Sequence, residues 1–111
     1  MQLDLMKNLH DIVESIDSVE EFIAGMSSYS EFRNNKLVKR AVERELGIIG
    51  EAVNRIKKDH PEVSLKNARK IIDLRNWVVH GYDKVDDAII WGVVKKHLPN
   101  LKEQVLELMK L

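Results

Sequence analysis

The chain has 111 residues, with 18 basic and 18 acidic side chains, no net charge and no cysteine. This length fits a single domain over residues 1–111, and the lack of cysteine excludes disulfides and a thiolate metal site. The zero net charge by itself argues against a non-specific nucleic-acid binder. With no signal peptide and no apolar run near the ~20 residues of a membrane span, we expect a cytoplasmic protein without membrane contact.

The charge is unevenly distributed along the chain. Residues 1–30 hold six acidic side chains and one basic, a net −5, whereas residues 31–75 hold twelve basic and seven acidic, a net +5. This asymmetry indicates either a local surface that faces an anion or two solvated helix faces of opposite sign packed together.

Apolar residues recur at helical spacing throughout, and no useful stretch alternates like a strand, so we expect an all-α fold. The first helix is predicted over residues 2–24 and is ended by Gly25. Residues 25–34 are predicted to form a loop, with a short turn anchored by Phe32. The buried stripe of the first helix is predicted to consist of Leu5, Leu9, Ile12, Ile16, Val19 and Ile23.

The second helix is predicted to run to about Lys58, with Asn34 or Asn35 as its cap, and Pro61 ends the connection that follows. Its predicted core residues are Leu37, Val38, Ala41, Leu46, Ile49, Val53 and Ile56. Ser64 is predicted to cap a third helix, which ends at Gly81 in a left-handed conformation. That helix is predicted to bury Ala68, Ile71, Ile72, Leu74, Trp77 and Val78.

A fourth helix is predicted after Asp86 as its cap, with Val85 and Ile90 at the positions of a hydrophobic staple. Pro99 is expected to break or kink the last helical region. That region resumes with Leu101, Val105, Leu106 and Met109. Four or five antiparallel helices with short loops predict an up-and-down bundle.

Residues 75–82 place four polar side chains at the end of the third helix, namely Arg75, Asn76, His80 and Tyr82. Burying such groups unpaired costs a few kcal/mol, so the cluster indicates a site. Without an acidic ligand pair or a glycine-rich phosphate loop, these groups suit phosphate-ester chemistry that needs no metal. Arg75 would hold the phosphate oxygens and His80 would move a proton. A lone histidine there could instead cap the helix, but its three polar neighbours favour catalysis.

The order Arg-Asn, three residues, His-x-Tyr resembles the signature of HEPN-domain ribonucleases, in which four to six residues separate arginine from histidine. The chain is similar to the HepT-like subgroup in particular, over roughly residues 32–101. The further matching segments are Ile49-Gly50-Glu51-Ala52, Val85-Asp86, Ile90-Trp91 and Leu98-Pro99.

This resemblance implies a helical bundle that forms a homodimer with its two Arg–His motifs facing each other across a cleft. It implies a metal-independent endoribonuclease toxin that acts on RNA without a cofactor. It also implies a partner, a small MNT-type nucleotidyltransferase antitoxin that attaches AMP to the tyrosine and can form a higher assembly with the dimer. By resemblance, Arg75 and His80 are catalytic, Asn76 assists them, and Tyr82 is the modified residue.

Glu51 is predicted to assist the same site. Gly47 and Gly50 are three residues apart and allow another helix to approach closely, so a partly buried Glu51 would need a cation. Arg75 is the candidate partner. The alternative is a solvated glutamate on an exposed face.

The remaining polar residues carry weaker signals. His10, His60 and His97 stand apart from one another and from suitable carboxylates, so we expect them at the surface and expect no structural metal. Trp77 and Trp91 fit either a dimer interface or the core.

A set of basic residues on the second helix follows helical spacing and either contacts RNA phosphates or forms a solvated face. These residues are Lys36, Lys39, Arg40 and Arg44.

The leading functional hypothesis is thus a ribonuclease toxin with its site at Arg75 and His80. A catalytically silent HEPN subunit of a nucleotidyltransferase complex is the alternative, and a purely structural dimer would leave the polar cluster unexplained. The intact Arg–His pair favours the first.

Overall fold

A computed structural model of the chain describes residues 3–65, 68–79 and 87–110, and for residues 68 and 77–79 it describes the backbone alone. This part is helical and contains no strand, which confirms the predicted all-α fold. Its elements are α1 (Leu3–Ile23), α2 (Tyr29–Arg33), α3 (Lys36–Asp59), α4 (Ala68–Val79), α5 (Asp87–Gly92), the π-helical segment η1 (Val93–His97) and α6 (Leu98–Met109).

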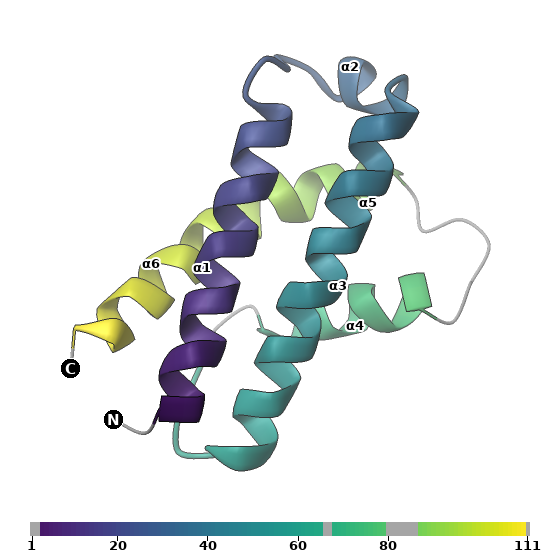
Figure 1. Ribbon diagram of the computed structural model, residues 1–111. Helices are drawn as coiled ribbons and strands as arrows, with labels where there is room; N and C mark the ends of the chain where they lie inside the picture. The colour runs from purple at the N-terminus through teal and green to yellow at the C-terminus, as the bar shows by residue number, and fades with distance from the viewer. Residues whose placement is uncertain (1–2, 66–67, 80–86, 111) are drawn as a thin grey trace.

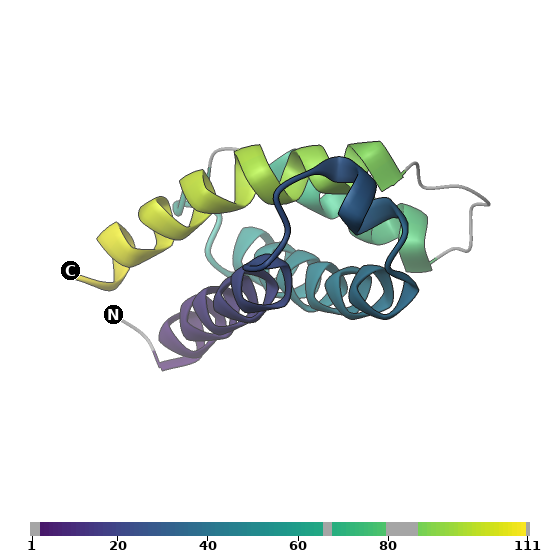
Figure 2. The same ribbon diagram turned by 90° about the horizontal axis from the view of Figure 1, so that it is seen from above.

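The helices form two layers (Figures 1 and 2). The long helices α1 and α3 lie side by side and antiparallel in one layer. The other layer contains α4 and the rod formed by α5, η1 and α6. None of the described helices is both long enough and apolar enough to cross a membrane.

The hydrophobic core lies between these layers. The predicted stripe of α1 is confirmed, because each of its six residues is at most 7% exposed. Leu37 was wrongly predicted to be buried and is 79% exposed. It lies five residues before the buried Val42, about 140° around the helix, and therefore faces away from α1. The other residues that α3 buries are Leu46, Ile49, Gly50, Ala52, Val53 and Ile56.

The start of α3 is fixed by a side-chain cap. The Asn35 side-chain oxygen accepts a hydrogen bond from the Val38 amide at 3.0 Å, so Asn35 rather than Asn34 is the cap. Phe32 in α2 is fully buried, and its ring centroid lies 5.2 Å from that of Trp91. Part of the predicted loop is thus the short helix α2, and Phe32 anchors it as predicted by packing against α5.

The predicted start of the third helix is wrong. Ser64 and Leu65 lie in an irregular connection, and α4 is described from Ala68 onward. Val63 and Leu65 pack against the core, so burial of apolar side chains holds this connection in a non-helical path. The predicted end at Gly81 and the start signals at Val85 and Asp86 lie outside the described residues.

The last helical region continues through Pro99, so the predicted break is wrong, and a π-helical turn distorts the helix just before the proline. The Leu98 amide donates to the Val93 carbonyl, a bond across five residues that defines the π-helical segment η1. Pro99 then occupies the first turn of α6, where a missing N–H is tolerated. The Asn100 side-chain amide donates to the Lys96 carbonyl at 3.2 Å. One wide turn thus accommodates the proline within a continuous rod.

Candidate functional site

The site begins where α4 crosses α3 at Gly50. A Cβ atom at position 50 would lie 2.5 Å from the Arg75 Cβ and 3.4 Å from the Ile71 carbonyl oxygen. Real Cβ atoms do not approach this closely, so only glycine permits the crossing. At Gly47 an added Cβ would meet nothing within 4 Å. The predicted close approach is therefore confirmed at Gly50 and wrong at Gly47.

Arg75 is held by two partners at this crossing. Its Nη2 donates to Glu51 Oε1 at 3.2 Å, and its Nη1 donates to Asn76 Oδ1 at 2.9 Å. The Arg75 side chain is 24% exposed and that of Glu51 is 50% exposed. The predicted pairing of Glu51 with Arg75 is confirmed, whereas the predicted partial burial of Glu51 is wrong, because its side chain is exposed. The guanidinium is positioned by residues from both helices.

The guanidinium retains donors beyond these two bonds. An arginine carries five N–H groups, and one on each terminal nitrogen is used here. Within the described part of the chain, the Arg75 Nε is buried and has no hydrogen-bond partner. Among the described residues, the second N–H group on each terminal nitrogen has no hydrogen-bond partner, so both groups can donate to an oxyanion.

The structure brings Arg75, Asn76 and Glu51 together. His80 and Tyr82 lie outside the described residues, as does the side chain of Trp77. The backbone of α4 is described up to Val79, the residue before His80. The four-residue spacing in the sequence places Asn76 and His80 on the same helix face. The structure shows in addition that Arg75 donates a hydrogen bond to Asn76.

His60 is buried, contrary to the prediction of a surface histidine. It is the C-terminal cap of α3, its side chain is 7% exposed, and its Nε2 lies 3.0 Å from Asp4 Oδ2 at the start of α1. The hydrogen bond with Asp4 raises the pKa of His60, and the same bond lowers the pKa of Asp4. The two residues are 56 apart in sequence, so their pairing depends on the fold.

His10 is exposed as predicted, but it does have carboxylate neighbours. Potential ligand atoms of His10, Asp11 and Glu14 lie within 4.8 Å of one another on α1. His10 Nδ1 lies 3.7 Å from a Glu14 carboxylate oxygen, and Lys7 binds Asp11 at 3.1 Å. His97 is half-buried, and burial lowers its pKa, with Lys70 and Lys96 adding to the shift.

Two of the basic residues predicted to form a charged face of α3 are paired with acids. Lys39 Nζ lies 3.0 Å from Asp87 Oδ2, which ties the start of α5 to α3, and Arg40 lies 3.5 Å from Glu43. Neutralisation by these partners favours a solvated, structural face over an RNA-binding one.

Trp91 packs on the core. It is half-buried, stacks near Phe32, and has the Lys95 ammonium 5.3 Å from its ring centroid. For Trp91, the core prediction is therefore the better one.

Comparison with known proteins gives a consistent result. A family model described as "Ribonuclease HepT-like" matches residues 12–108. The chain is 38% identical over 104 residues to "Putative RNase MJ1380" of Methanocaldococcus jannaschii, covering 92% of this chain and 94% of that protein. It is 36% identical over 106 residues to "Probable ribonuclease HepT" of Thermococcus cleftensis, covering 92% and 93%. No solved structure matches the chain significantly.

Proposed function

Because the chain belongs to the HepT-like ribonuclease family, we propose that it is a metal-independent endoribonuclease and the toxin of a toxin–antitoxin pair. The observation that carries this proposal is the position of the Arg75 guanidinium, five residues before His80. Glu51 and Asn76 each accept one hydrogen bond from this guanidinium, and further N–H groups on it can donate to a phosphate. A fixed cation with open N–H groups suits a phosphate whose charge increases during the reaction.

In the proposed reaction, Arg75 binds the non-bridging oxygens of the scissile phosphate. One His80 removes the proton from the neighbouring ribose 2′-hydroxyl, and the 2′-oxygen forms a bond to phosphorus. The bond from phosphorus to the 5′-oxygen breaks, and that oxygen takes a proton from a second histidine. The products are a 2′,3′-cyclic phosphate and a 5′-hydroxyl.

This scheme needs two histidines, but each chain supplies one at this motif. A two-fold homodimer with its motifs facing each other supplies both, because the same patch is repeated on the two subunits. Asn76 and Glu51 hold Arg75 in the geometry that the phosphate requires.

The proposed regulator is an MNT-type nucleotidyltransferase antitoxin that modifies Tyr82. The phenol oxygen would attack the α-phosphorus of ATP, forming an O–P bond as the bond to the β-phosphate breaks and pyrophosphate leaves. The attached AMP would place a phosphate two residues from His80, where it could pair with Arg75 and repel RNA.

The test of catalysis is RNA cleavage by the purified protein in the presence of EDTA. General acid–base catalysis contributes about 10²–10⁴ in rate, so His80→Ala and Arg75→Ala should each abolish detectable cleavage. His10→Ala, which alters an exposed histidine on α1, is the matched control and should remain active. Cleavage that requires added Mg²⁺ and survives His80→Ala would contradict the proposal.

The test of regulation is co-expression with the neighbouring nucleotidyltransferase followed by intact-mass and peptide mass spectrometry. Mass added in AMP units at Tyr82, together with lost cleavage, supports control by modification. An inhibited complex with unmodified Tyr82 would indicate steric blocking instead. A protein that binds the partner without ever cleaving RNA would indicate the silent HEPN subunit.

A further inference from the structure

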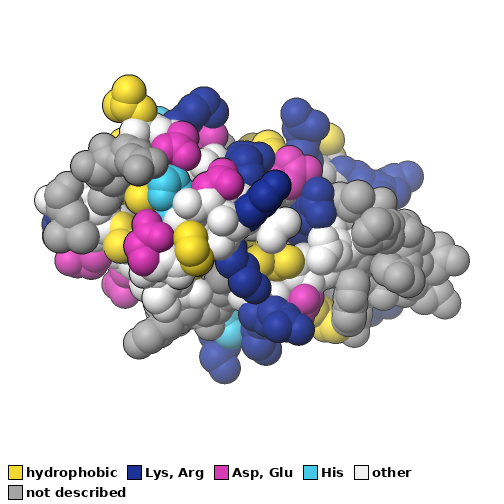
Figure 3. Space-filling model, turned by 90° about the horizontal axis from the view of Figure 1, so that it is seen from below, with side chains coloured by type: hydrophobic (Ala, Val, Ile, Leu, Met, Phe, Trp, Pro, Cys, Tyr) yellow, Lys and Arg dark blue, Asp and Glu magenta, His cyan; other side chains and the backbone are white. Residues whose placement is uncertain are grey.

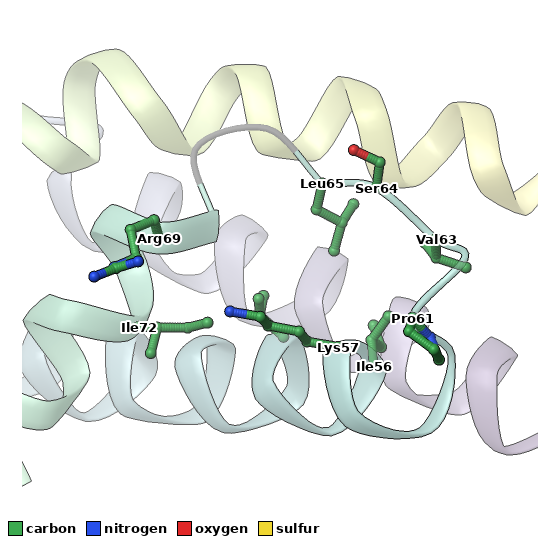
Figure 4. Close-up of a pocket in the computed structure, with 9 residues that line it drawn as sticks. Ile56, Lys57, Pro61, Val63, Ser64, Leu65, Arg69 and Ile72 are labelled. Carbon is green, nitrogen blue, oxygen red and sulfur yellow. The ribbon is translucent and has the colours of Figure 1, made fainter.

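A cavity of about 340 Å³ lies between the C-terminal half of α3, the start of α4 and residues 61–65, which follow α3 (Figure 4). We call it the Lys57 cavity. Its lining includes the apolar side chains of Val53, Ile56, Leu65 and Ile72, and nearly half of its exposed surface is polar. Sites for small organic ligands typically have this size and combine apolar walls with a few polar groups that fix the ligand.

The Lys57 cavity continues the crossing that holds Arg75. Val53 lies three residues after Gly50 on α3, and Ile72 lies three residues before Arg75 on α4. The cavity is therefore about one helical turn from the site on both helices. A strand of RNA bound at Arg75 has only a short distance to cover to reach it.

Two cations from different helices stand at the cavity. Figure 4 shows the Lys57 side chain extending from α3 toward α4, with Arg69 at the rim on α4. The Arg69 Nε lies 3.4 Å from an Asp73 carboxylate oxygen, and its side chain is 82% exposed. None of the described residues that line the cavity is acidic. Asp73 therefore neutralises Arg69. Among the described residues, Lys57 makes no ion pair, so it is the cation that attracts an anion to this cavity.

The face seen from below is of mixed character. Figure 3 shows lysine and arginine side chains over much of it, with acidic and hydrophobic side chains exposed among them. A mixed surface of this kind fits single-stranded nucleic acid, because phosphates need cations and unpaired bases need apolar contact.

We propose that the Lys57 cavity is a nucleotide subsite, in which one unpaired base enters the pocket and its phosphate binds Lys57. The proposal rests on the proposed function, since it assigns this nucleotide to the RNA that Arg75 holds. Lys57 lies seven residues after Gly50, about 10 Å along α3 and on nearly the same face, so the bound nucleotide is close to the scissile phosphate. The subsite gives the enzyme a base preference on one side of the cut.

The phosphate contact is tested by the salt dependence of RNA binding, measured by fluorescence anisotropy in the His80→Ala background to prevent cleavage. Each phosphate neutralised on a single strand contributes about 0.7 to the slope of log K against log salt. Lys57→Gln should lower that slope by about 0.7 and weaken binding several-fold. Lys58→Gln removes the same charge from the next residue, which does not line the cavity, and should leave the slope unchanged. Equal effects of the two variants would overturn the phosphate contact.

The base contact is tested by sequencing the cleavage products of a randomised single-stranded RNA pool. Ile72→Phe narrows the cavity and should change the base preference at one position next to the cut. Ile89→Phe alters an exposed apolar residue outside the cavity and should leave the profile as in the unmodified protein. Thermal unfolding verifies that each variant is folded. The base subsite would be overturned if the cleavage sites showed no base preference at the positions next to the cut. It would also be overturned if Ile72→Phe left that preference unchanged.

These experiments separate the inference from the function on which it rests. If the unmodified protein cleaves RNA and Lys57→Gln behaves like Lys58→Gln, only the subsite fails. If the unmodified protein binds RNA through Lys57 without cleaving it, the ribonuclease proposal fails while the subsite remains. If it does not bind RNA at all, both fail.

Discussion

Gly50 lies directly beneath Arg75, so that even a single added carbon on α3 would be 2.5 Å from the Arg75 Cβ and 2.8 Å from its Cγ. The position of the guanidinium is therefore set by the absence of a side chain on the neighbouring helix. Glu51, the next residue on α3, then binds the guanidinium at 3.2 Å. The dipeptide Gly50-Glu51 therefore leaves room for the Arg75 side chain and also orients its guanidinium.

Gly50→Ala should destabilise the protein by about 1–3 kcal/mol, because the methyl group forces α3 and α4 apart at a packed crossing. It should also lower RNA cleavage by displacing Arg75. Gly47→Ala is the matched control on the same helix, where a Cβ meets nothing and alanine should stabilise by up to about 1 kcal/mol. Urea unfolding and cleavage rates measure both effects, and equal stabilities of the two variants would show that the crossing is not tight.

Glu51→Gln should reduce cleavage far more than it reduces stability. The carboxylate is half exposed, so losing its ion pair costs about 0–1 kcal/mol of folding free energy. Loss of the Glu51 charge nevertheless removes the ion pair that, together with the Asn76 hydrogen bond, orients the Arg75 guanidinium. Glu43→Gln, which breaks the ion pair with the exposed Arg40 on the same helix, should change neither quantity appreciably. Full cleavage activity in Glu51→Gln would remove Glu51 from the site.

Stability should depend on pH through His60 and Asp4. The raised pKa of His60 means that its contribution is full below about pH 6.5 and is lost as pH rises through the folded-state pKa. The lowered pKa of Asp4 means that its contribution is present above about pH 3.8 and is lost as pH falls through the folded-state value. The pair therefore stabilises most between these limits.

Asp4→Asn should accordingly lower the melting temperature at pH 6 more than at pH 9. Melting curves of both proteins across this range measure the difference, and any effect of His97 is common to both. His10→Gln, on the exposed face of α1, should preserve the profile of the unmodified protein. Parallel profiles for Asp4→Asn and the unmodified protein would contradict the linkage.

The protein should sediment as a two-fold dimer at micromolar concentration. If catalysis needs both histidines, only dimers of two unmodified subunits are active. In mixtures with His80→Ala, the cleavage activity should therefore fall with the square of the fraction of unmodified subunits. No mixture of His80→Ala with Arg75→Ala should recover full activity. A monomer in sedimentation, or a linear loss of activity, would exclude the shared site.

The helical repeat of apolar residues correctly predicted which residues of α1 are buried, because their burial depends on one face of a single helix. The stripe of α1 is buried as predicted because burial along a long amphipathic helix follows its 3.6-residue repeat. The same reasoning failed at Leu37, which stands in the first turn of α3 outside the contact with α1. It also missed Val42, which is fully buried.

Other features depend on contacts between distant segments and could not be predicted in this way. His60 is buried because α1 starts beside the end of α3, and Ser64 lies in a connection held by core packing. The Lys57 cavity likewise depends on how α4 leaves that connection. By contrast, the pairing of Glu51 with Arg75 could be predicted, because a glycine beside a carboxylate indicates both a close approach and a need for a cation.

The π-helical segment has a consequence for how the rod formed by α5, η1 and α6 tolerates changes in length. In this segment the backbone hydrogen bond spans five residues instead of the four of an α-helix. The stretch Val93–His97 therefore contains one residue more than a regular α-helix would have at this place. Deleting one residue there would let the turn close to α-helical geometry while both flanking apolar stripes kept their faces. Single-residue deletions should therefore be tolerated between Val93 and His97, whereas one in the middle of α6 would rotate Val105 off the core.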